Sequence, residues 1–135
     1  MNIQHLLLPN LPTMQRALTL RSARQELLSQ NLANAATPNY QAVDLDFEAS
    51  MRAAEQRPVA PMAVTDPHHL RMTDGSGDVP VEMTVSTTGA GLDGNTVDVE
   101  EAMGTMAENT VLYGATAQIT AGIFASVIQA IREGR

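Results

Sequence analysis

The chain contains one uncharged stretch near its C-terminus that is too long for an ordinary surface helix. No side chain between Glu108 and Arg132 carries a charge, and no proline occurs from Thr96 to Arg132. A surface helix normally has a charged or polar side opposite its apolar stripe. This stretch is apolar, small or weakly polar on every side, so we expect either protein or lipid to surround it.

Lipid suits this stretch less well than protein, because uncharged polar side chains would lie inside the bilayer and no basic cluster flanks them. Neighbouring helices would explain Gly104, Gly114 and Gly122, since a helical glycine costs about 1 kcal/mol relative to Ala but permits close approach. The plain alternative is a merely weak helix. We expect packing by neighbouring protein and no membrane span. The polar residues concerned are Asn109, Thr110, Thr116, Gln118, Thr120, Ser126 and Gln129.

Two helices with heptad spacing are predicted, one at each end of the chain. Residues 13–35 contain no Gly or Pro and begin at Thr13, the expected N-cap. Residues 96–133 form the second helix, which Asn95 or Thr96 would cap. Its seam alternates steps of four and three residues through Val99, Met103, Met106, Thr110, Tyr113, Ala117, Thr120, Phe124, Val127 and Ile131.

The first helix has the same spacing, but Arg21 and Gln25 interrupt its apolar seam. Polar residues in such a seam typically fix register or partner choice. We therefore expect a mainly α fold, in which the two helices pack as a coiled-coil-like pair, parallel or antiparallel. The seam of the first helix runs through Leu11, Met14, Leu18, Arg21, Gln25, Leu28, Leu32 and Ala35.

The central segment, residues 36–95, is rich in proline and glycine and is predicted to consist of short β-strands, turns and loops. Apolar and polar residues alternate over 79–85, which predicts a short edge strand, and 59–64 is its expected partner. The acidic residues Asp44, Asp46 and Glu48 are interpreted as a solvated turn. With a flexible N-terminal segment over 1–12, the four segments 1–12, 13–35, 36–95 and 96–133 form one structural unit.

Composition narrows the function. The chain has 135 residues, a net charge of −7 and no cysteine, and its eight basic residues are all arginines. Its length suits one domain, and an acidic chain is a poor partner for nucleic acid or anionic lipid. Residues 1–9 contain three consecutive leucines but no basic residue, so no cleaved secretory signal is expected.

The sequence offers little for catalysis or metal binding. His68 and His69 are adjacent, which rarely lets both face one ion, and no further ligand pattern supports them. The run from Asp74 to Val85 begins like a calcium-binding loop but has Val79 where glycine is required. No nucleophile elbow or phosphate-binding loop occurs. We expect no enzyme activity, no metal and no cofactor.

The end of the first helix carries the most specific motif. Asn31-Leu32-Ala33-Asn34 closes the helix and Thr37-Pro38-Asn39-Tyr40 follows. Two asparagines one turn apart at a helix end can satisfy free carbonyls, and a proline prevents the helix from continuing. We therefore expect a hinge at a helix stop, formed by Asn31, Asn34, Thr37, Pro38 and Tyr40.

This motif resembles the N-terminal signature of bacterial flagellar rod and hook proteins, in which N-x-A-N precedes T-P-x-Y. Further stretches, 41–47, 65–70 and 94–100, with the end of the chain, are similar to the flagellar basal-body rod family, and within it to the proximal rod proteins. The resemblance covers nearly the whole chain. It implies a structural subunit that assembles helically with itself and with related rod proteins, and that transmits torque across the periplasm.

The resemblance also implies partners and a location. The partners are other rod proteins, the adaptor protein that joins the rod to the membrane ring, and the flagellar type III export apparatus. The location is the periplasmic rod of the basal body. Independently of the resemblance, the apolar surface of two helices is too small to offset the conformational entropy of ordering them, so we expect the isolated chain to be partly disordered until assembly. The alternatives are a sister axial protein of the rod or hook, or a coiled-coil adaptor or export chaperone. The expected packing residues are Leu28, Leu32, Met103, Met106, Leu112, Tyr113, Ala117, Ile123, Phe124 and Val127.

Overall fold

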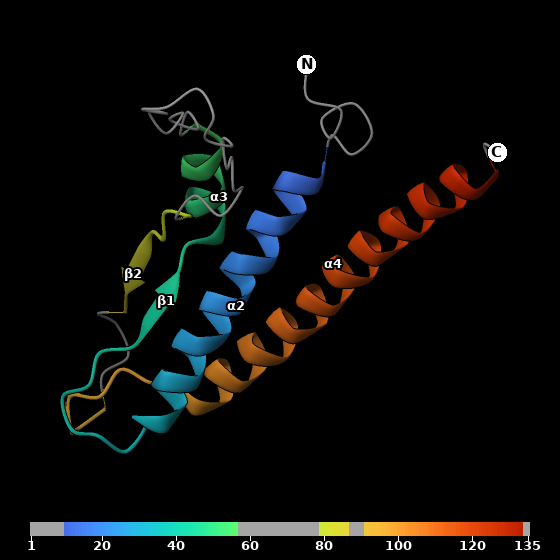
Figure 1. The fold of residues 1–135 in the computed structure, drawn as a ribbon. Helices are drawn as coiled ribbons and strands as arrows, with labels where there is room; N and C mark the ends of the chain where they lie inside the picture. The colour runs from blue at the N-terminus through green and yellow to red at the C-terminus, as the bar shows by residue number, and fades with distance from the viewer. Residues whose placement is uncertain (1–9, 57–78, 87–90, 134–135) are drawn as a thin grey trace, which may run out of the picture.

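The computed structural model describes residues 10–56, 79–86 and 91–133. Long helices lie near both ends of the chain, and the short elements lie between them in sequence (Figure 1). This confirms the predicted mainly α fold with a central segment of short strands and loops. The elements are α2 (Leu11–Ala33), β1 (Val43–Leu45), α3 (Phe47–Gln56), β2 (Met83–Val85) and α4 (Val99–Glu133).

The helices α2 and α4 run antiparallel and meet at the base of the molecule, where α2 ends and α4 begins (Figure 1). Asn109, ten residues into α4, bonds to Arg21 and Gln25, which lie twelve and eight residues before Ala33. The last turn of α2 and the first turn of α4 therefore lie at about the same height at the base. Because α4 has 35 residues and α2 has 23, α4 extends about twelve residues, or roughly 18 Å, beyond α2 at the other end.

Both long helices begin at places other than those predicted. Helix α2 begins at Leu11, with Asn10 as an N-cap residue that makes no side-chain cap bond. A proline in the first helical turn is tolerated, because an N–H at that position would have no partner within the helix. Helix α4 begins at Val99, and Asp98 is its cap: the Asp98 carboxylate accepts the N–H groups of residues 100 and 101 at 2.9 and 3.1 Å.

The ten-residue helix α3 was not predicted. Its start is capped by Asp46, whose carboxylate accepts the Ala49 N–H at 2.9 Å. Ser50 and Ala54, four residues apart, form its buried side. The interpretation of the acidic residues as a solvated turn was therefore wrong. Asp44 lies within β1 and Asp46 caps α3, so each has a structural role in an ordered element.

The two strands form an antiparallel pair in which Val43 is opposite Val85 and Leu45 is opposite Met83. The predicted strand over 79–85 is confirmed in its last three residues. Its partner in the described chain is β1, whereas the expected partner, 59–64, lies outside the described residues.

The buried core of the described residues is small and partly polar. It lies where α2 meets β1, α3 and the first turns of α4. Its buried apolar members are Leu20, Leu28, Leu45, Ala54 and Ala102, and its buried polar members are Asn31, Ser50, Asn95 and Asn109.

The side of α4 that is covered within the chain differs from the predicted seam. The buried residues Ala102 and Asn109 lie seven residues apart and form one heptad position of the covered side. The prediction had placed Met103 and Thr110 at this position, but both are exposed. Asn109 determines this rotation, since its amide bonds to α2 require it to point inward. Part of the other predicted heptad position, Met106 and Val127, is half-buried.

Candidate functional site

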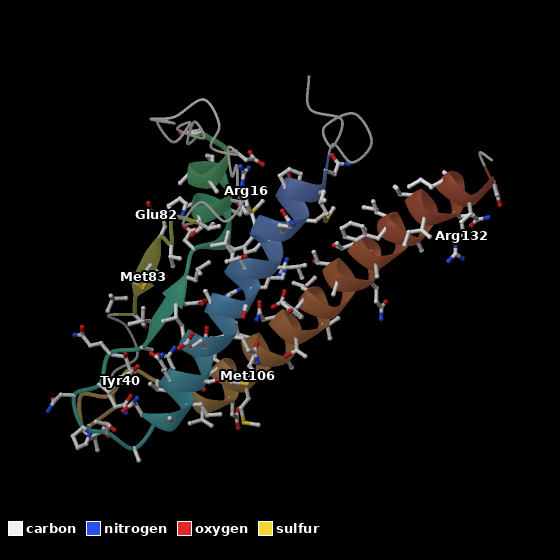
Figure 2. The ribbon with its side chains drawn as sticks, in the orientation of Figure 1. Arg16, Tyr40, Glu82, Met83, Met106 and Arg132 are labelled. Atoms are coloured by element: carbon white, nitrogen blue, oxygen red, sulfur yellow. The ribbon has the colours of Figure 1, made fainter. Side chains whose placement is uncertain are left out.

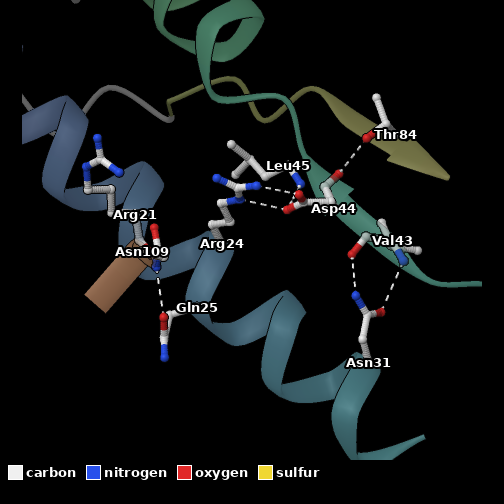
Figure 3. Close-up of polar contacts among 9 residues, drawn as sticks. All are labelled: Arg21, Arg24, Gln25, Asn31, Val43, Asp44, Leu45, Thr84 and Asn109. Atoms are coloured by element: carbon white, nitrogen blue, oxygen red, sulfur yellow. Dashed lines mark hydrogen bonds and ion pairs between the residues drawn. The ribbon is translucent and has the colours of Figure 1, made fainter. Parts of the chain in front are cut away.

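The predicted helix stop forms a hydrogen-bonded junction at the base of the molecule, where Tyr40 lies (Figure 2). Asn31, 4% exposed, points from the last turns of α2 to β1. Its Nδ2 donates to the Val43 carbonyl at 2.7 Å, and its Oδ1 accepts the Val43 N–H at 3.1 Å (Figure 3). The Tyr40 hydroxyl donates to the same Oδ1 at 3.2 Å. Asn31 thus fastens the returning chain to α2.

The rest of the motif closes the end of α2. Asn34 Nδ2 donates to the Gln30 carbonyl at 2.8 Å, as expected for an amide at a helix end. The Thr37 hydroxyl donates to Asn34 Oδ1 at 3.2 Å, and the Thr37 N–H donates to the Asn34 carbonyl at 2.9 Å. Pro38 is exposed and follows this turn. The structure therefore brings Asn31, Asn34, Thr37 and Tyr40 into one network.

Asn95 completes the junction, and its role was missed in the sequence. It was expected to cap the second helix, but its side chain reaches the end of the first. Its Nδ2 lies 2.9–3.0 Å from the carbonyl oxygens of Asn34, Ala35 and Thr37, and its Oδ1 accepts the Val97 N–H at 2.8 Å. These carbonyls lie about 60 residues away in sequence, so no local pattern around Asn95 indicates the contact.

The backbone of the junction requires two residues in the left-handed region. Asn39 has φ 59° and Gly94 has φ 75°. The two are in contact, and a Cβ added to Gly94 would lie 2.5 Å from Asn39 Oδ1. The Asn39 N–H also donates to the Asp93 carbonyl at 2.9 Å. Glycine is therefore favoured at position 94 by its backbone conformation, and a side chain there would also displace the Asn39 amide.

A second set of polar contacts holds α2 to β1 through an ion pair. Arg24 Nε and Nη2 donate to the two carboxylate oxygens of Asp44 at 2.8 and 2.6 Å (Figure 3). This bidentate hydrogen bonding raises the pKa of Arg24, against a smaller opposite effect of burial.

The residues that interrupt the first seam contact α4 directly. Asn109, 1% exposed, donates from Nδ2 to the Arg21 carbonyl at 2.9 Å and to Gln25 Oε1 at 2.8 Å. The Arg21 guanidinium lies 4.4 Å from the centre of the Phe47 ring, and burial lowers its pKa. The Gln25 side chain thus contacts α4 directly, whereas Arg21 contacts α4 through its main-chain carbonyl and its side chain packs on α3.

Helix α4 beyond Asn109 presents large apolar side chains to solvent in the single chain. Leu112, Tyr113 and Phe124, three of the predicted packing residues, are 38–43% exposed, and Met103 is 57% exposed. Leu32, Met106, Ala117, Ile123 and Val127 are half-buried, and Leu28 is buried in the core. The largest further exposed residues are Val111, Ile119, Ile128 and Ile131.

Four hydroxyl groups of α4 are satisfied within the helix itself. The hydroxyls of Thr110, Thr116, Thr120 and Ser126 each donate to the carbonyl four residues earlier, at 2.8–3.0 Å. A Cβ added to any of the three helical glycines of α4 would meet no atom within 4 Å. These four hydroxyls are therefore not free, and the surface of α4 is sterically open at its three glycines.

By length and composition, α4 is one helix of the described residues that is long and apolar enough to cross a membrane. The same residues show no group of three or more His, Cys, Asp or Glu side chains that could hold a metal ion. His68 and His69 and the calcium-like run before Val79 lie outside the described residues.

Comparisons with known proteins agree with the N-terminal motif and extend beyond it. The family model described as "Flagella basal body rod protein" matches residues 11–41, from the start of α2 through the helix stop. The "Flagellar basal body rod protein FlgB" of Escherichia coli (strain K12) is 30% identical, with 89% of this chain and 91% of that protein covered. The proteins of the same name from Salmonella typhimurium and Cereibacter sphaeroides are 36% and 37% identical, each covering 73% of this chain and 75% and 74% of their own length.

Proposed function

This chain belongs to the flagellar basal body rod protein family, and from that premise we propose that the exposed surface of α4 is the part through which it assembles. The protein is a structural subunit of the flagellar basal body rod, and its family is a structural one. What remains to be assigned is which surface meets the neighbouring subunits.

One observation carries this assignment. The 23 residues between Glu108 and Arg132 are uncharged, and several of their large apolar side chains are exposed in the single chain. The side chains of Ile119 and Ile128 are 54% and 52% exposed. Their burial would lower the free energy, and it requires a neighbouring molecule to cover them. Neighbouring subunits of the rod supply that cover.

The detailed chemistry of α4 supports protein over lipid as the cover. Buried Asn109 binds α2 within the same chain, so this part of α4 has a protein partner already. The self-satisfied hydroxyls and the open glycines permit close, dry packing between helices. We therefore assign α4 to helix packing inside the rod and not to a membrane span.

Further parts of the proposal follow from family membership. The subunit associates with itself and with other rod proteins in the proximal rod, contacts the adaptor that joins the rod to the membrane ring, and transmits torque across the periplasm. It reaches that place through the flagellar type III export apparatus without a cleaved signal, and it completes its folding on assembly as one structural unit. It has no catalytic role. The junction of Asn31, Asn34, Thr37, Pro38 and Tyr40 acts as the hinge between the terminal helix and the central segment.

The test changes an exposed residue of α4 that is not needed within the chain. Ile119→Arg places a charge on the exposed surface, and Ile119→Leu keeps the site apolar. In a strain that lacks its own copy, we expect Ile119→Leu to restore swimming and rod formation and Ile119→Arg to restore neither. Circular dichroism of both purified variants should show equal helix content. Normal rods with Ile119→Arg would contradict the assignment.

Analytical ultracentrifugation of the purified protein, together with analysis of isolated basal bodies, separates the rod subunit from an adaptor or export chaperone. An adaptor or chaperone acts as a discrete oligomer, so the purified protein would form a stable, fully helical dimer at micromolar concentration. Its absence from isolated basal bodies would also be expected in that case. The rod subunit should instead be recovered in the basal body itself.

A further inference from the structure

Helix α4 turns the less apolar of two adjacent sides towards α2. The side that faces α2, which we call the covered side, consists of Ala102, Asn109 and Thr116, and all three are buried or half-buried. The adjacent side, which we call the outer side, consists of Met103, Thr110 and Tyr113. Met103 and Tyr113 are 57% and 43% exposed. A turn of α4 about its own axis by one residue step, about 100°, or less would exchange the two sides.

Burial of apolar surface alone would favour the opposite orientation. Met103 has a larger apolar side chain than Ala102, and the ring of Tyr113 adds further apolar area. The opposite orientation would also leave the Asn109 amide in water, where it needs no partner from the protein. The observed orientation therefore requires an interaction that outweighs this difference in burial.

Asn109 supplies this interaction (Figure 3). Its Nδ2 donates to the Arg21 carbonyl at 2.9 Å and to Gln25 Oε1 at 2.8 Å. Within the described residues, these are the two hydrogen bonds that side chains of α4 make to α2. The ion pair of Arg24 joins α2 to β1 instead. The polar contact between the two long helices therefore depends on one amide.

Gln25 makes this contact specific to one level of α2. Every residue of a helix has a carbonyl, so the Arg21 carbonyl by itself offers little selectivity. A side-chain acceptor is rarer, because the positions one heptad before and after Gln25 are Leu18 and Leu32. The Asn109 amide therefore meets a side-chain oxygen at this level and would meet an apolar side chain at either neighbouring one. A buried Asn selects one helix packing among several in the same way in coiled coils.

The contact does not give the greatest possible stability. Asn109 is 1% exposed, and its Oδ1 is buried and has no hydrogen-bond partner within the part of the chain that the structure describes. A buried acceptor without a donor lowers the free energy of unfolding relative to an apolar side chain of similar size. Asn109 thus fixes the orientation of α4 at a cost in stability.

We infer that Asn109 is a positioning residue for assembly: it holds the outer side of α4 away from α2 and so keeps Met103 and Tyr113 available to neighbouring subunits. This inference rests on the proposed function, because it assigns the residue that presents part of the assembling surface. Without the Asn109 amide, α4 would turn and cover Met103 against the α2 of its own chain. The single chain would then be more stable and less able to assemble.

The first test measures the orientation of α4 in the purified full chain, which contains no cysteine of its own. Ala102→Cys places one thiol on the covered side, and Met103→Cys places one on the outer side. In the otherwise unchanged chain, the thiol at position 103 should react with a maleimide at least about 10-fold faster than the thiol at position 102, because a buried thiol reacts only after local opening. When Asn109→Leu is added to each variant, the order should reverse.

Two controls accompany this labelling. Gln118→Leu makes the same kind of change, from an amide to a leucine, at an exposed residue of α4 and keeps Asn109, so position 103 should remain the faster. Gln25→Glu keeps an acceptor oxygen opposite Asn109 and should also preserve the order. Equal labelling of the two positions in the otherwise unchanged chain, or an unchanged order with Asn109→Leu, would overturn the inference.

The second test compares stability with assembly. Asn109→Leu should raise the midpoint of thermal unfolding of the purified chain, and yet reduce rod formation and swimming in a strain that lacks its own copy. A merely structural role for Asn109 predicts a lower midpoint, so a lower midpoint, or normal swimming, would contradict the inference. The proposed function would stand in either case provided that Ile119→Arg still abolishes rod formation, so the two failures are distinguishable.

Discussion

Asn31 binds the backbone of Val43 through both ends of its amide, at 2.7 Å from Nδ2 to the carbonyl and at 3.1 Å from the N–H to Oδ1. The Asn31 side chain, near the end of α2, thus makes the pair of backbone hydrogen bonds to Val43 that a neighbouring strand would otherwise make. Because Asn31 is buried, this pair of bonds has no competition from water. It explains why the helix stop is followed by an ordered turn that comes back along α2.

The first prediction concerns this contact. Asn31→Asp removes the donor to the Val43 carbonyl and places a carboxylate beside it, and we expect a loss of about 2–3 kcal/mol in the free energy of unfolding. Urea unfolding followed by circular dichroism measures it. Asn34→Asp is the matched control, since Asn34 is half-exposed and its Nδ2 makes one hydrogen bond. Equal losses for the two variants would contradict the special role of Asn31.

Asn95 gives the second prediction. Asn95→Ala leaves the three carbonyls at the end of α2 without their shared donor, so we expect a loss of about 2 kcal/mol in the free energy of unfolding and faster amide exchange in the last turn of α2. Asn10→Ala is the control, because the Asn10 side chain makes no cap bond. It should change the stability by less than about 0.5 kcal/mol. An unchanged exchange rate in Asn95→Ala would show that the contact does not hold the junction.

The third prediction compares two glycines. Gly122→Ala adds a methyl group that meets nothing in the single chain, so it should stabilise the free helix by about 1 kcal/mol. In the rod it should reduce assembly if a neighbouring helix approaches there. Gly94→Ala should destabilise the chain, because φ is +75° and Asn39 Oδ1 lies in the way. Thermal unfolding and swimming in soft agar report the two effects separately, and normal swimming with Gly122→Ala would exclude close approach at this glycine.

The fourth prediction concerns Thr120, where a charge is expected to block assembly. Thr120 is half-buried and its hydroxyl donates to the Thr116 carbonyl at 2.8 Å. Thr120→Arg should therefore abolish swimming and also lower the free energy of unfolding of the isolated chain, by about 1–3 kcal/mol. Ile119→Arg, one residue away and exposed, should abolish swimming with little change in stability. Wild-type swimming in the Thr120 variant would count against packing at this level of α4.

Local sequence was enough to predict the two long helices and the stop between α2 and β1. Both depend on interactions within a few residues: the spacing of apolar side chains along a helix and the exclusion of Pro38 from a continuing helix. The polar interruption at Arg21 and Gln25 was also visible, because it breaks a regular period. Helix α3 was missed because its ten residues lie in a segment whose prolines and glycines favoured turns and strands.

The sequence by itself determined that α4 would be long, uncharged between Glu108 and Arg132, and in need of cover, since charge and periodicity are properties of the chain alone. Only the tertiary structure decided which side of α4 faces α2, that Asn95 closes the end of a helix about 60 residues before it, and that α4 extends beyond its partner. These depend on which groups meet across long sequence separations. A buried amide has to find its hydrogen-bond partners wherever the fold brings them. Asn109 shows the reason most clearly: its two bonds to α2 turn the whole helix, and with it the apolar surface that remains exposed.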